Sequence, residues 1–295
     1  MCVVDKIKPM LFKFKNRSLP CDGRTYLVGI VNVTPDSFSD GSKYLSSTSA
    51  VKHCMDLLDF GADIIDIGGE STRPGAEAVG AEEEIRRILP VICEVRKLRG
   101  EAVISVDTMK AEVAEKALSA GADIVNDVSA LRNSQDLGKV IARHNAGVIL
   151  MHMRGNPKTM QSDLDYGDLV GEINSFLADS VSRAVEAGIN IENTVVDPGI
   201  GFGKSHEQNI RIISEIEKFR KTGRPLLVGP SRKAFIGNIL GGGVPSAERV
   251  WGTAGAVAYL AMKKTDFIRV HDVKEMSQML KSFFLLDCLA PYEKL

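Results

Sequence analysis

The sequence lacks paired cysteines, an excess of charge of either sign and long apolar runs, and each of these absences argues against a class of protein. Its formal net charge of −1 gives no electrostatic footprint for nucleic acid or for an anionic membrane surface. No apolar run approaches the ~18 residues that a membrane span requires. The five cysteines are odd in number and contain no CxxC pair, which favours a reducing compartment over a disulfide framework. The sequence therefore predicts a cytoplasmic protein without nucleic-acid or membrane partners.

Several motifs of common enzyme classes are also absent. The chain has no GxGxxG, GxxxxGK[ST], HExxH or GxSxG, which argues against a dinucleotide fold, a P-loop, a zinc peptidase and an α/β-hydrolase. Near the N-terminus, Lys13 and Lys15 interrupt the apolar segment, so no signal peptide is predicted.

What the chain does contain is eight short apolar runs, each followed by polar or charged residues. Stretches long enough for a helix separate successive runs. This alternation predicts an α/β protein with a (β/α)8, or TIM, barrel. In such a barrel the carboxyl ends of the strands share one mouth, where residues distant in sequence meet. The runs with their following residues are Leu27–Val31 with Asn32, Ile64–Ile67 with Glu70, Ala102–Val106 with Asp107, Asp123–Val125 with Asn126, Gly147–Met151 with His152, Thr194–Val196 with Asp197, Leu226–Val228 with Ser231, and Phe267–Ile268 with Arg269 and His271.

The remaining segments complete the predicted organisation. Residues 1–25 are expected to form a β-hairpin that covers the barrel floor, with a turn at Pro20–Gly23. Residues 26–295 are expected to form the barrel as a single domain, in which Gly241–Gly243 break the seventh helical region. The helices are expected near 47–60, 81–99, 110–120, 134–145, 167–187, 206–221, 231–239 with 246–263, and 272–289.

An internal repeat supports the barrel. Gly61-Ala-Asp-Ile-Ile-Asp resembles Gly121-Ala-Asp-Ile-Val-Asn, which lies two βα units further along the chain. In both copies a helical segment stops at a glycine, as a left-handed C-cap requires, and a strand follows at once.

Acidic and amide side chains end three of the predicted strands: Asp107, Asn126 and Asp197. A carboxylate at a strand end often only caps the next helix, and Asp107 precedes a helix-like segment. Asp197 precedes Pro-Gly, where no helix begins, so capping explains it poorly. Two carboxylates and an amide at one mouth suit a flat heterocycle with several N–H donors. Phe202 could stack on such a ring or only pack within its loop.

Cationic residues follow the last two runs. Ser231 and Lys233 are expected at the start of a helix, where the N-terminal dipole favours an anion; the alternative is a basic helix start that faces solvent. Arg269 and His271 point the same way in a strand, so both can contact one phosphate. His271 could instead be a general base or a helix cap.

Two long loops follow the first two predicted strands. Residues 29–42 are rich in small polar residues and suit a mobile lid. The amide oxygen of Asn32 could ligate a hard cation such as Mg2+, or could simply cap the strand end. In the second loop, Thr72 offers a hydroxyl and Arg73 can bind a phosphate or carboxylate; the alternative is a surface turn with a solvated arginine.

Together these segments resemble the dihydropteroate synthases, a family of pterin-binding TIM barrels. Asn-Val-Thr-Pro-Asp-Ser-Phe-Ser-Asp-Gly within Val31–Gly41 is similar to the first signature of the family, and Gly-Gly-Glu-Ser-Thr-Arg-Pro-Gly within Ile67–Gly75 is similar to the second. The resemblance covers roughly residues 26–285, in the right order. The other similar blocks are Ser105–Thr108, Asn126-Asp127, Asp197–Gly203, Ser231–Lys233 and Arg269–His271.

The resemblance implies a transferase of folate biosynthesis and a target of sulfonamides. Such an enzyme condenses 6-hydroxymethyl-7,8-dihydropterin pyrophosphate with 4-aminobenzoate to give 7,8-dihydropteroate and pyrophosphate. The implied catalytic residues are Asp107, Lys233, Arg269 and His271. The implied roles are Asp107, Asn126, Asp197 and Lys233 for the pterin, Asn32 for Mg2+ and pyrophosphate, Arg269 and His271 for pyrophosphate, Thr72 and Arg73 near the reacting groups, and Ser231 for the carboxylate of 4-aminobenzoate.

The implied chemistry needs little acid–base machinery. Pyrophosphate is a good leaving group when cations bind it, the dihydropterin ring can stabilise a cation at its exocyclic CH2, and the arylamine then attacks. Catalysis would rest on positioning and electrostatic stabilisation, so His271 is predicted not to be an essential proton acceptor. Two alternatives are a methyltetrahydrofolate-dependent corrinoid methyltransferase and a non-catalytic pterin-binding barrel.

The family also leads us to expect a homodimer. The Gly- and Ala-rich stretch Gly252–Met262, together with the last helix, is its predicted surface; the alternative is close helix packing within the fold. Trp251 is expected in the core.

Overall fold

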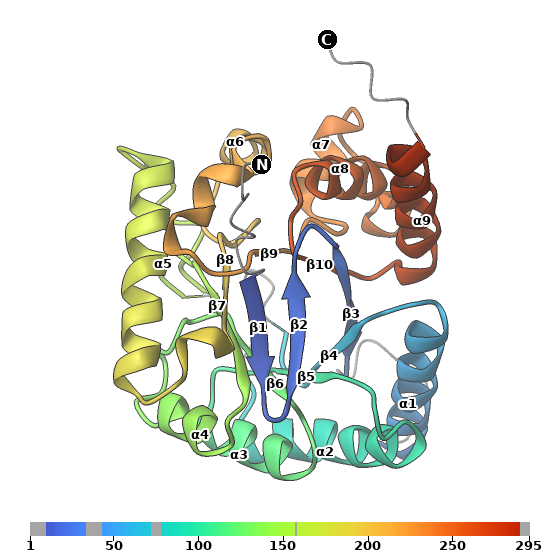
Figure 1. The fold of residues 1–295 in the computed structure, drawn as a ribbon, viewed down its shortest axis with the longest axis vertical. Coiled ribbons are helices and arrows are strands. Elements are labelled where there is room, and N and C mark those ends of the chain that lie inside the picture. Colours follow the sequence, from blue (N-terminus) through green and yellow to red (C-terminus); the bar gives the residue numbers. More distant parts are fainter. Residues whose placement is uncertain (1–9, 34–42, 72–77, 157, 290–295) are drawn as a thin grey trace, which may run out of the picture.

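Eight parallel strands surrounded by helices form a barrel (Figure 1). The computed structural model describes residues 10–33, 43–71, 78–156 and 158–289. Neighbouring strands pair in the order β8-β7-β6-β5-β4-β3-β10-β9, and a parallel bridge between Val196 and Leu226 joins the two outer strands. The predicted fold class is therefore confirmed. The barrel strands are β3 (Tyr26–Asn32), β4 (Ile64–Gly68), β5 (Ile104–Asp107), β6 (Ile124–Asp127), β7 (Gly147–Met151), β8 (Thr194–Asp197), β9 (Leu227–Val228) and β10 (Phe267–Val270).

The helices follow the predicted alternation. The sixth expected helix stops early and continues as 3-10 turns, and the seventh region breaks at Gly241–Gly243, as predicted. The helices are α1 (Lys43–Asp59), α2 (Ala81–Leu98), α3 (Ala111–Ser119), α4 (Leu137–Arg143), α5 (Leu169–Glu186), α6 (His206–Ser214), α7 (Ala234–Ile239), α8 (Val250–Met262) and α9 (Val273–Leu289), with 3-10 helices η2 (Ile191–Asn193), η3 (Ile216–Thr222) and η4 (Ser246–Glu248).

The N-terminal segment forms the predicted hairpin, β1 (Met10–Phe14) and β2 (Arg17–Cys21), across the barrel floor (Figure 1). Phe12 and Phe14 are fully buried among the inward side chains at the amino ends of the strands. The expected turn at Pro20–Gly23 is wrong as the hairpin turn. Phe14 pairs with Arg17, so the chain reverses at Lys15, whose φ is +49°, and Asn16.

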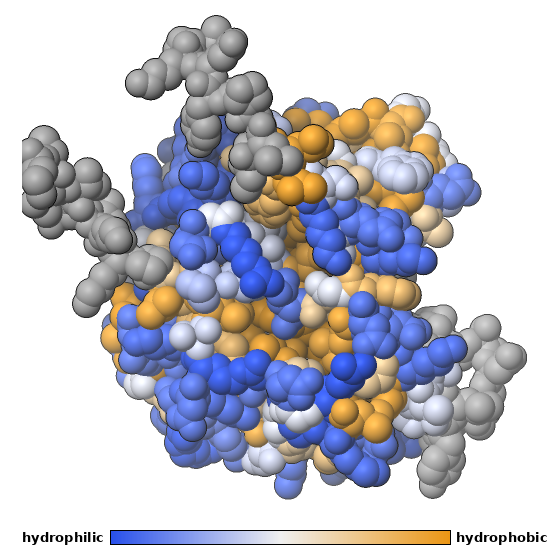
Figure 2. All heavy atoms as spheres, turned by 45° about the vertical axis from the view of Figure 1, so that its right-hand side comes forward, coloured by the Kyte–Doolittle hydropathy of each residue, from blue (hydrophilic) through white to orange (hydrophobic). Residues whose placement is uncertain are grey.

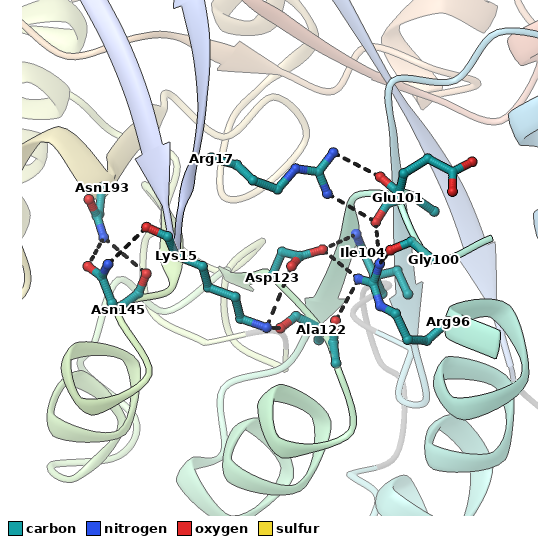
Figure 3. Close-up of polar contacts among 12 residues, drawn as sticks. Lys15, Arg17, Arg96, Gly100, Glu101, Ile104, Ala122, Asp123, Asn145 and Asn193 are labelled. Atoms are coloured by element: carbon teal, nitrogen blue, oxygen red, sulfur yellow. Dashed lines mark hydrogen bonds and ion pairs between the residues drawn. The ribbon is translucent and has the colours of Figure 1, made fainter.

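Polar contacts fasten the hairpin to the floor (Figure 3). The Nζ atom of Lys15 donates to the carbonyl of Ala122 at 2.6 Å and lies 3.5 Å from the carboxylate of Asp123. Asp123 also binds Arg96 at 2.8 Å, while Arg17 donates to the carbonyl of Glu101 at 2.8 Å. Because the hairpin closes the amino end of the barrel, only the carboxyl end is left as a mouth.

Helices α7, α8 and α9 carry exposed hydrophobic side chains. Figure 2 brings this side of the molecule forward and shows hydrophobic atoms in its upper right part. The expectation that Trp251 lies in the core is wrong, because Trp251 is 77% exposed. A single apolar residue in a helical pattern does not reveal which face of the helix is covered. None of the helices in the described ranges is long and apolar enough to span a membrane.

Candidate active site

Four side chains from four strands meet at the barrel mouth. Arg269 of β10 donates from Nε to Oδ2 of Asp66 on β4 at 2.7 Å, and from Nη2 to Oδ2 of Asp107 on β5 at 2.9 Å. Asn126 of β6 donates from Nδ2 to the same Oδ2 of Asp66 at 2.9 Å. The structure thus brings Asp107, Asn126 and Arg269 into one hydrogen-bonded cluster, and Asp66 lies at its centre.

Asp107 does not cap the helix that follows its strand. Thr108 Oγ1 accepts from the backbone N–H of Lys110, where α3 begins, and the carboxylate of Asp107 faces Arg269 instead. Burial raises the pKa of Asp107 to about 7; the Arg269 charge opposes the rise and the Asp66 charge adds to it. This carboxyl therefore titrates near neutral pH.

A second cluster comes from the loops after β8 and β9. The backbone N–H of Gly199 donates to Oδ1 of Asp197 at 2.7 Å. Lys233 Nζ lies 4.2 Å from the centre of the Phe202 ring. Burial raises the pKa of Asp197 to about 6 and lowers that of Lys233 to about 8, and each charge partly offsets the shift of the other. The charge of Arg269 also lowers the pKa of Lys233 and that of Asp107 raises it, so the two clusters belong to one site.

The glycines of the β8–α6 loop are there for steric reasons. Gly199 has φ +72°, and a Cβ atom on it would lie 1.9 Å from the carbonyl oxygen of His152. Gly201 has φ +81°, and its Cβ would lie 2.9 Å from Cδ of Lys233. Glycine therefore allows the loop to pass close to both neighbours and to present Asp197 and Phe202 at the mouth.

Ser231 and His271 contact each other. The Ser231 hydroxyl lies 3.0 Å from Nδ1 of His271 and accepts the backbone N–H of His271 at 3.1 Å. Burial, helped by the Arg269 and Arg232 charges, lowers the pKa of His271 to about 3. The imidazole is therefore neutral at physiological pH.

The helix expected to begin at Ser231 begins at Ala234, and Lys233 is its N-cap. Arg232 has φ +59°, which no helix tolerates, and its guanidinium pairs with Asp272. The positive charge of Arg232 is thus balanced within the protein. The expectation that Ser231 lies in the first turn of a helix is wrong, because a turn separates Ser231 from α7, a helix of six residues. Anion binding at Ser231 stays a prediction.

Three predicted site residues belong to the first two loops. Asn32 ends β3 beside Gly68 of β4 and is half-buried at the mouth. Its side-chain amide makes no hydrogen bond to another described residue. Thr72 and Arg73 lie outside the described residues. Within the described ranges, no group of three or more His, Cys, Asp or Glu side chains could hold a metal ion.

Two buried ionisable residues of the site are missing from the prediction. Asp66 is fully buried, although its carboxylate interrupts an apolar run. A signal existed, because Asp66 occupies the position in the internal repeat that Asn126 occupies in the second copy. Lys204 is buried with Nζ 2.9 Å from Nδ1 of His152 and 2.8 Å from the carbonyl of Phe202. Nothing in the sequence distinguishes it from an exposed lysine.

The arrangement at the barrel mouth suits a flat ring rich in N–H donors, with a cationic group beside it. Carboxylates and an amide carbonyl accept hydrogen bonds, and a lysine over an aromatic ring donates one. The fold and these groups together are those of a barrel enzyme for a flat, N–H-rich substrate.

Comparisons with known proteins agree with this class. Residues 28–271 match the family model described as pterin binding enzyme. A dihydropteroate synthase of Synechocystis is 48% identical over 258 residues, which are 88% of this chain and 89% of the relative. The structure of Xanthomonas albilineans dihydropteroate synthase with 4-aminobenzoic acid has a TM-score of 0.88 and 39% identity, and covers 95% of this chain and 99% of its own. The Yersinia pestis dihydropteroate synthase in a sulfonamide drug complex has a TM-score of 0.87 and 38% identity, and the match covers 95% of this chain and 100% of the Yersinia chain. The chain belongs to the pterin-binding enzymes and, within them, to the dihydropteroate synthase family.

Proposed function

We propose that this chain condenses 6-hydroxymethyl-7,8-dihydropterin pyrophosphate with 4-aminobenzoate, giving 7,8-dihydropteroate and pyrophosphate. The observation that carries the proposal is the convergence of Asp107, Asn126, Asp197 and Lys233 at one barrel mouth, with Arg269 between them. This set matches the donors and acceptors of a pterin, and the family relationship supplies the reaction.

The pterin ring is held by acceptors opposite its N–H groups. Asp107 and Asp197 accept hydrogen bonds from ring and amino N–H donors. Asn126 gives its N–H to Asp66, so its carbonyl oxygen is the group it offers to the ring. Lys233 donates to a ring carbonyl or nitrogen, and Phe202, next to Lys233, provides an apolar face for the ring.

Pyrophosphate binds at the cationic side of the mouth. Arg269 uses Nε and Nη2 for Asp66 and Asp107, and Nη1 has no hydrogen-bond partner among the described residues, so it is the atom that Arg269 can offer to a phosphate oxygen. His271 offers its remaining ring nitrogen, because Nδ1 faces Ser231. Asn32 offers one amide oxygen, which suits Mg2+ because this ion commonly takes few protein ligands and completes its shell with water and phosphate oxygens. Bound there, Mg2+ would neutralise negative charge on the leaving group.

Catalysis in this site is positioning and electrostatic stabilisation. Buried cations lower the cost of the negative charge that develops on the departing pyrophosphate. The neutral His271, with its low pKa, is a hydrogen-bond donor to phosphate rather than a proton acceptor. We place the carboxylate of 4-aminobenzoate near Ser231, and Thr72 and Arg73 near the reacting groups.

Pyrophosphate release measured with and without 4-aminobenzoate tests the function. Release that depends on 4-aminobenzoate and yields 7,8-dihydropteroate supports the synthase. Pterin binding without any release supports a non-catalytic barrel, and methyl transfer from methyltetrahydrofolate to a corrinoid supports the methyltransferase; either result rejects the proposal.

We also propose that the chain forms a homodimer through α7, α8 and α9. Large exposed apolar side chains on neighbouring helices are costly in water and are typical of an interface. Sedimentation of Trp251→Ser is expected to show weakened self-association, whereas Leu98→Ser on α2 leaves it unchanged. A monomeric wild-type protein contradicts the proposal. The residues that form this surface are Ile239, Leu240, Trp251, Met262, Leu285 and Leu286.

We place the protein in the cytoplasm, because Cys21, Cys54 and Cys93, the cysteines in the described ranges, are all free thiols. The division into an N-terminal hairpin, 1–25, and a single barrel domain, 26–295, stays a prediction.

A further inference from the structure

Asp66 is a buried charge whose presence needs a physical reason. It is 0% exposed, and its Oδ2 atom accepts both of its hydrogen bonds, from Arg269 and Asn126. Its Oδ1 atom is buried without a partner among the described residues. Burying a carboxylate with one oxygen unsatisfied is expensive, and an apolar residue at this strand position would avoid the cost. The ring-binding and phosphate-binding roles proposed above do not use Asp66 directly.

The geometry shows what Asp66 does to Arg269. A guanidinium often binds one carboxylate with two parallel N–H groups, such as Nε and Nη2. In Arg269 the guanidinium edge that carries Nε and Nη2 is divided between two carboxylates, because Nε donates to Asp66 and only Nη2 donates to Asp107. Asp107 therefore gives Arg269 one oxygen, and its Oδ1 makes no hydrogen bond to another described residue. Without Asp66, the same edge of Arg269 could take both oxygens of Asp107.

Asp66 also sets the orientation of the Asn126 amide. Because Nδ2 donates to the Asp66 carboxylate, the carbonyl end is fixed away from it. A free amide could flip and present a donor to a ring that itself offers N–H groups.

We propose that Asp66 is a positioning residue that divides the guanidinium edge of Arg269 and fixes the Asn126 amide, so that one oxygen of Asp107 and the carbonyl of Asn126 stay open to the pterin ring. This inference rests on the proposed function of the site. Asp66 contacts no substrate in it; its effect passes through Arg269, Asn126 and Asp107.

Two variants separate the hydrogen bonds from the charge. Asp66→Ala removes both, and we expect the Kd for 6-hydroxymethyl-7,8-dihydropterin pyrophosphate, measured by calorimetry without 4-aminobenzoate, to rise at least tenfold. Asp66→Asn keeps an oxygen that can accept from Arg269 and Asn126 but removes the charge, so the Kd should rise less. The matched control is Asp266→Asn, a buried aspartate paired with Arg220 at the barrel floor, which should leave the Kd unchanged.

The pH dependence of binding reports on Asp107, and a purely structural role for Asp66 would not move it. Removing the Asp66 charge removes a contribution that raises the pKa of Asp107, so the acid limb of binding should move to lower pH by about one unit in Asp66→Asn. The other groups that face Asp107, which both proteins keep, are Arg269 on β10, Glu84 on α2, Asp127 on β6 and Lys233 after β9.

A double-mutant cycle tests the coupling to Asn126. The losses of affinity in Asp66→Ala and Asn126→Ala should be smaller in combination than their sum, because one effect acts through the other. Unchanged Kd values and an unmoved acid limb in folded Asp66 variants overturn the inference. A wild type that fails to bind the pterin rejects the proposed function instead. Should neither variant fold, the Arg269 Nε–H in the wild type must exchange slowly with solvent by NMR, and fast exchange overturns the inference.

Discussion

The substitution Asp107→Asn should make the protein less sensitive to pH while it damages the site. Asp107 is buried, and its folded pKa of about 7 lies above the unfolded value of 3.8. A raised carboxyl pKa contributes stability at low pH, and this stability is lost as the pH rises from the unfolded pKa through the folded pKa. The wild type should therefore lose stability between about pH 4 and pH 7 through this group. Asparagine does not titrate, so the variant lacks the effect.

The size of the effect follows from the pKa difference. At 1.36 kcal/mol per pKa unit, a rise from 3.8 to about 7 corresponds to about 4 kcal/mol once the buried group is fully ionised. By linkage, about 2–3 kcal/mol of this develops between pH 5 and pH 7.5. Asparagine also weakens the contact with Arg269. This changes the free energy of unfolding of the variant by an amount that varies little between pH 5 and pH 7.5. Asp197, with its pKa of about 6, titrates in both proteins and largely cancels in the comparison.

Urea unfolding of both proteins at several pH values between 5 and 7.5 measures this difference. We expect the free energy of unfolding of Asp107→Asn to gain about 2–3 kcal/mol relative to the wild type across the range. At the same time the Kd for the pterin should rise about 10- to 100-fold, because a hydrogen bond to a charged group contributes roughly 1.5–3 kcal/mol. Parallel stability curves for the two proteins would show that Asp107 does not titrate in this range, and full pterin affinity in the variant would show that its carboxylate does not hold the ring.

Three further predictions concern the floor, the β8–α6 loop and His271. Phe12→Ala should lower the free energy of unfolding by about 3–5 kcal/mol, measured by urea, because Phe12 fills the barrel floor. Gly199→Ala should cost about 1–2 kcal/mol for its left-handed backbone and about 1–3 kcal/mol for overpacking against His152, and should weaken pterin binding through Asp197; a stable variant with normal affinity contradicts the steric argument. His271→Gln should keep the acid limb of the pH–rate profile; a variant that binds both substrates normally yet loses turnover together with that limb would show that His271 is a proton acceptor after all.

Most of the fold could be predicted because its signals are local. A parallel strand buried on both faces reads as a continuous apolar run, and the glycines that end helices before β4 and β6 have φ values of +101° and +113°, as predicted for left-handed caps. The position of the hairpin turn has no clear local signal, because Pro20 and Gly23 are typical turn residues, whereas Lys15 is not. The exposure of Trp251 has none either, because burial depends on what covers a helix.

The barrel, the strand ends and the residue types gathered at its mouth can be inferred from the amino-acid sequence alone, since they follow from periodicity and from the geometry that all parallel barrels share. The partners of those side chains appear only in the folded molecule: Asp66 joins Arg269 to Asn126, Asp272 pairs with Arg232, and the buried Lys204 donates to the carbonyl of Phe202. Hydrogen bonds and burial are set over a few ångströms between strands that lie far apart in the chain, and no local sequence pattern records those distances.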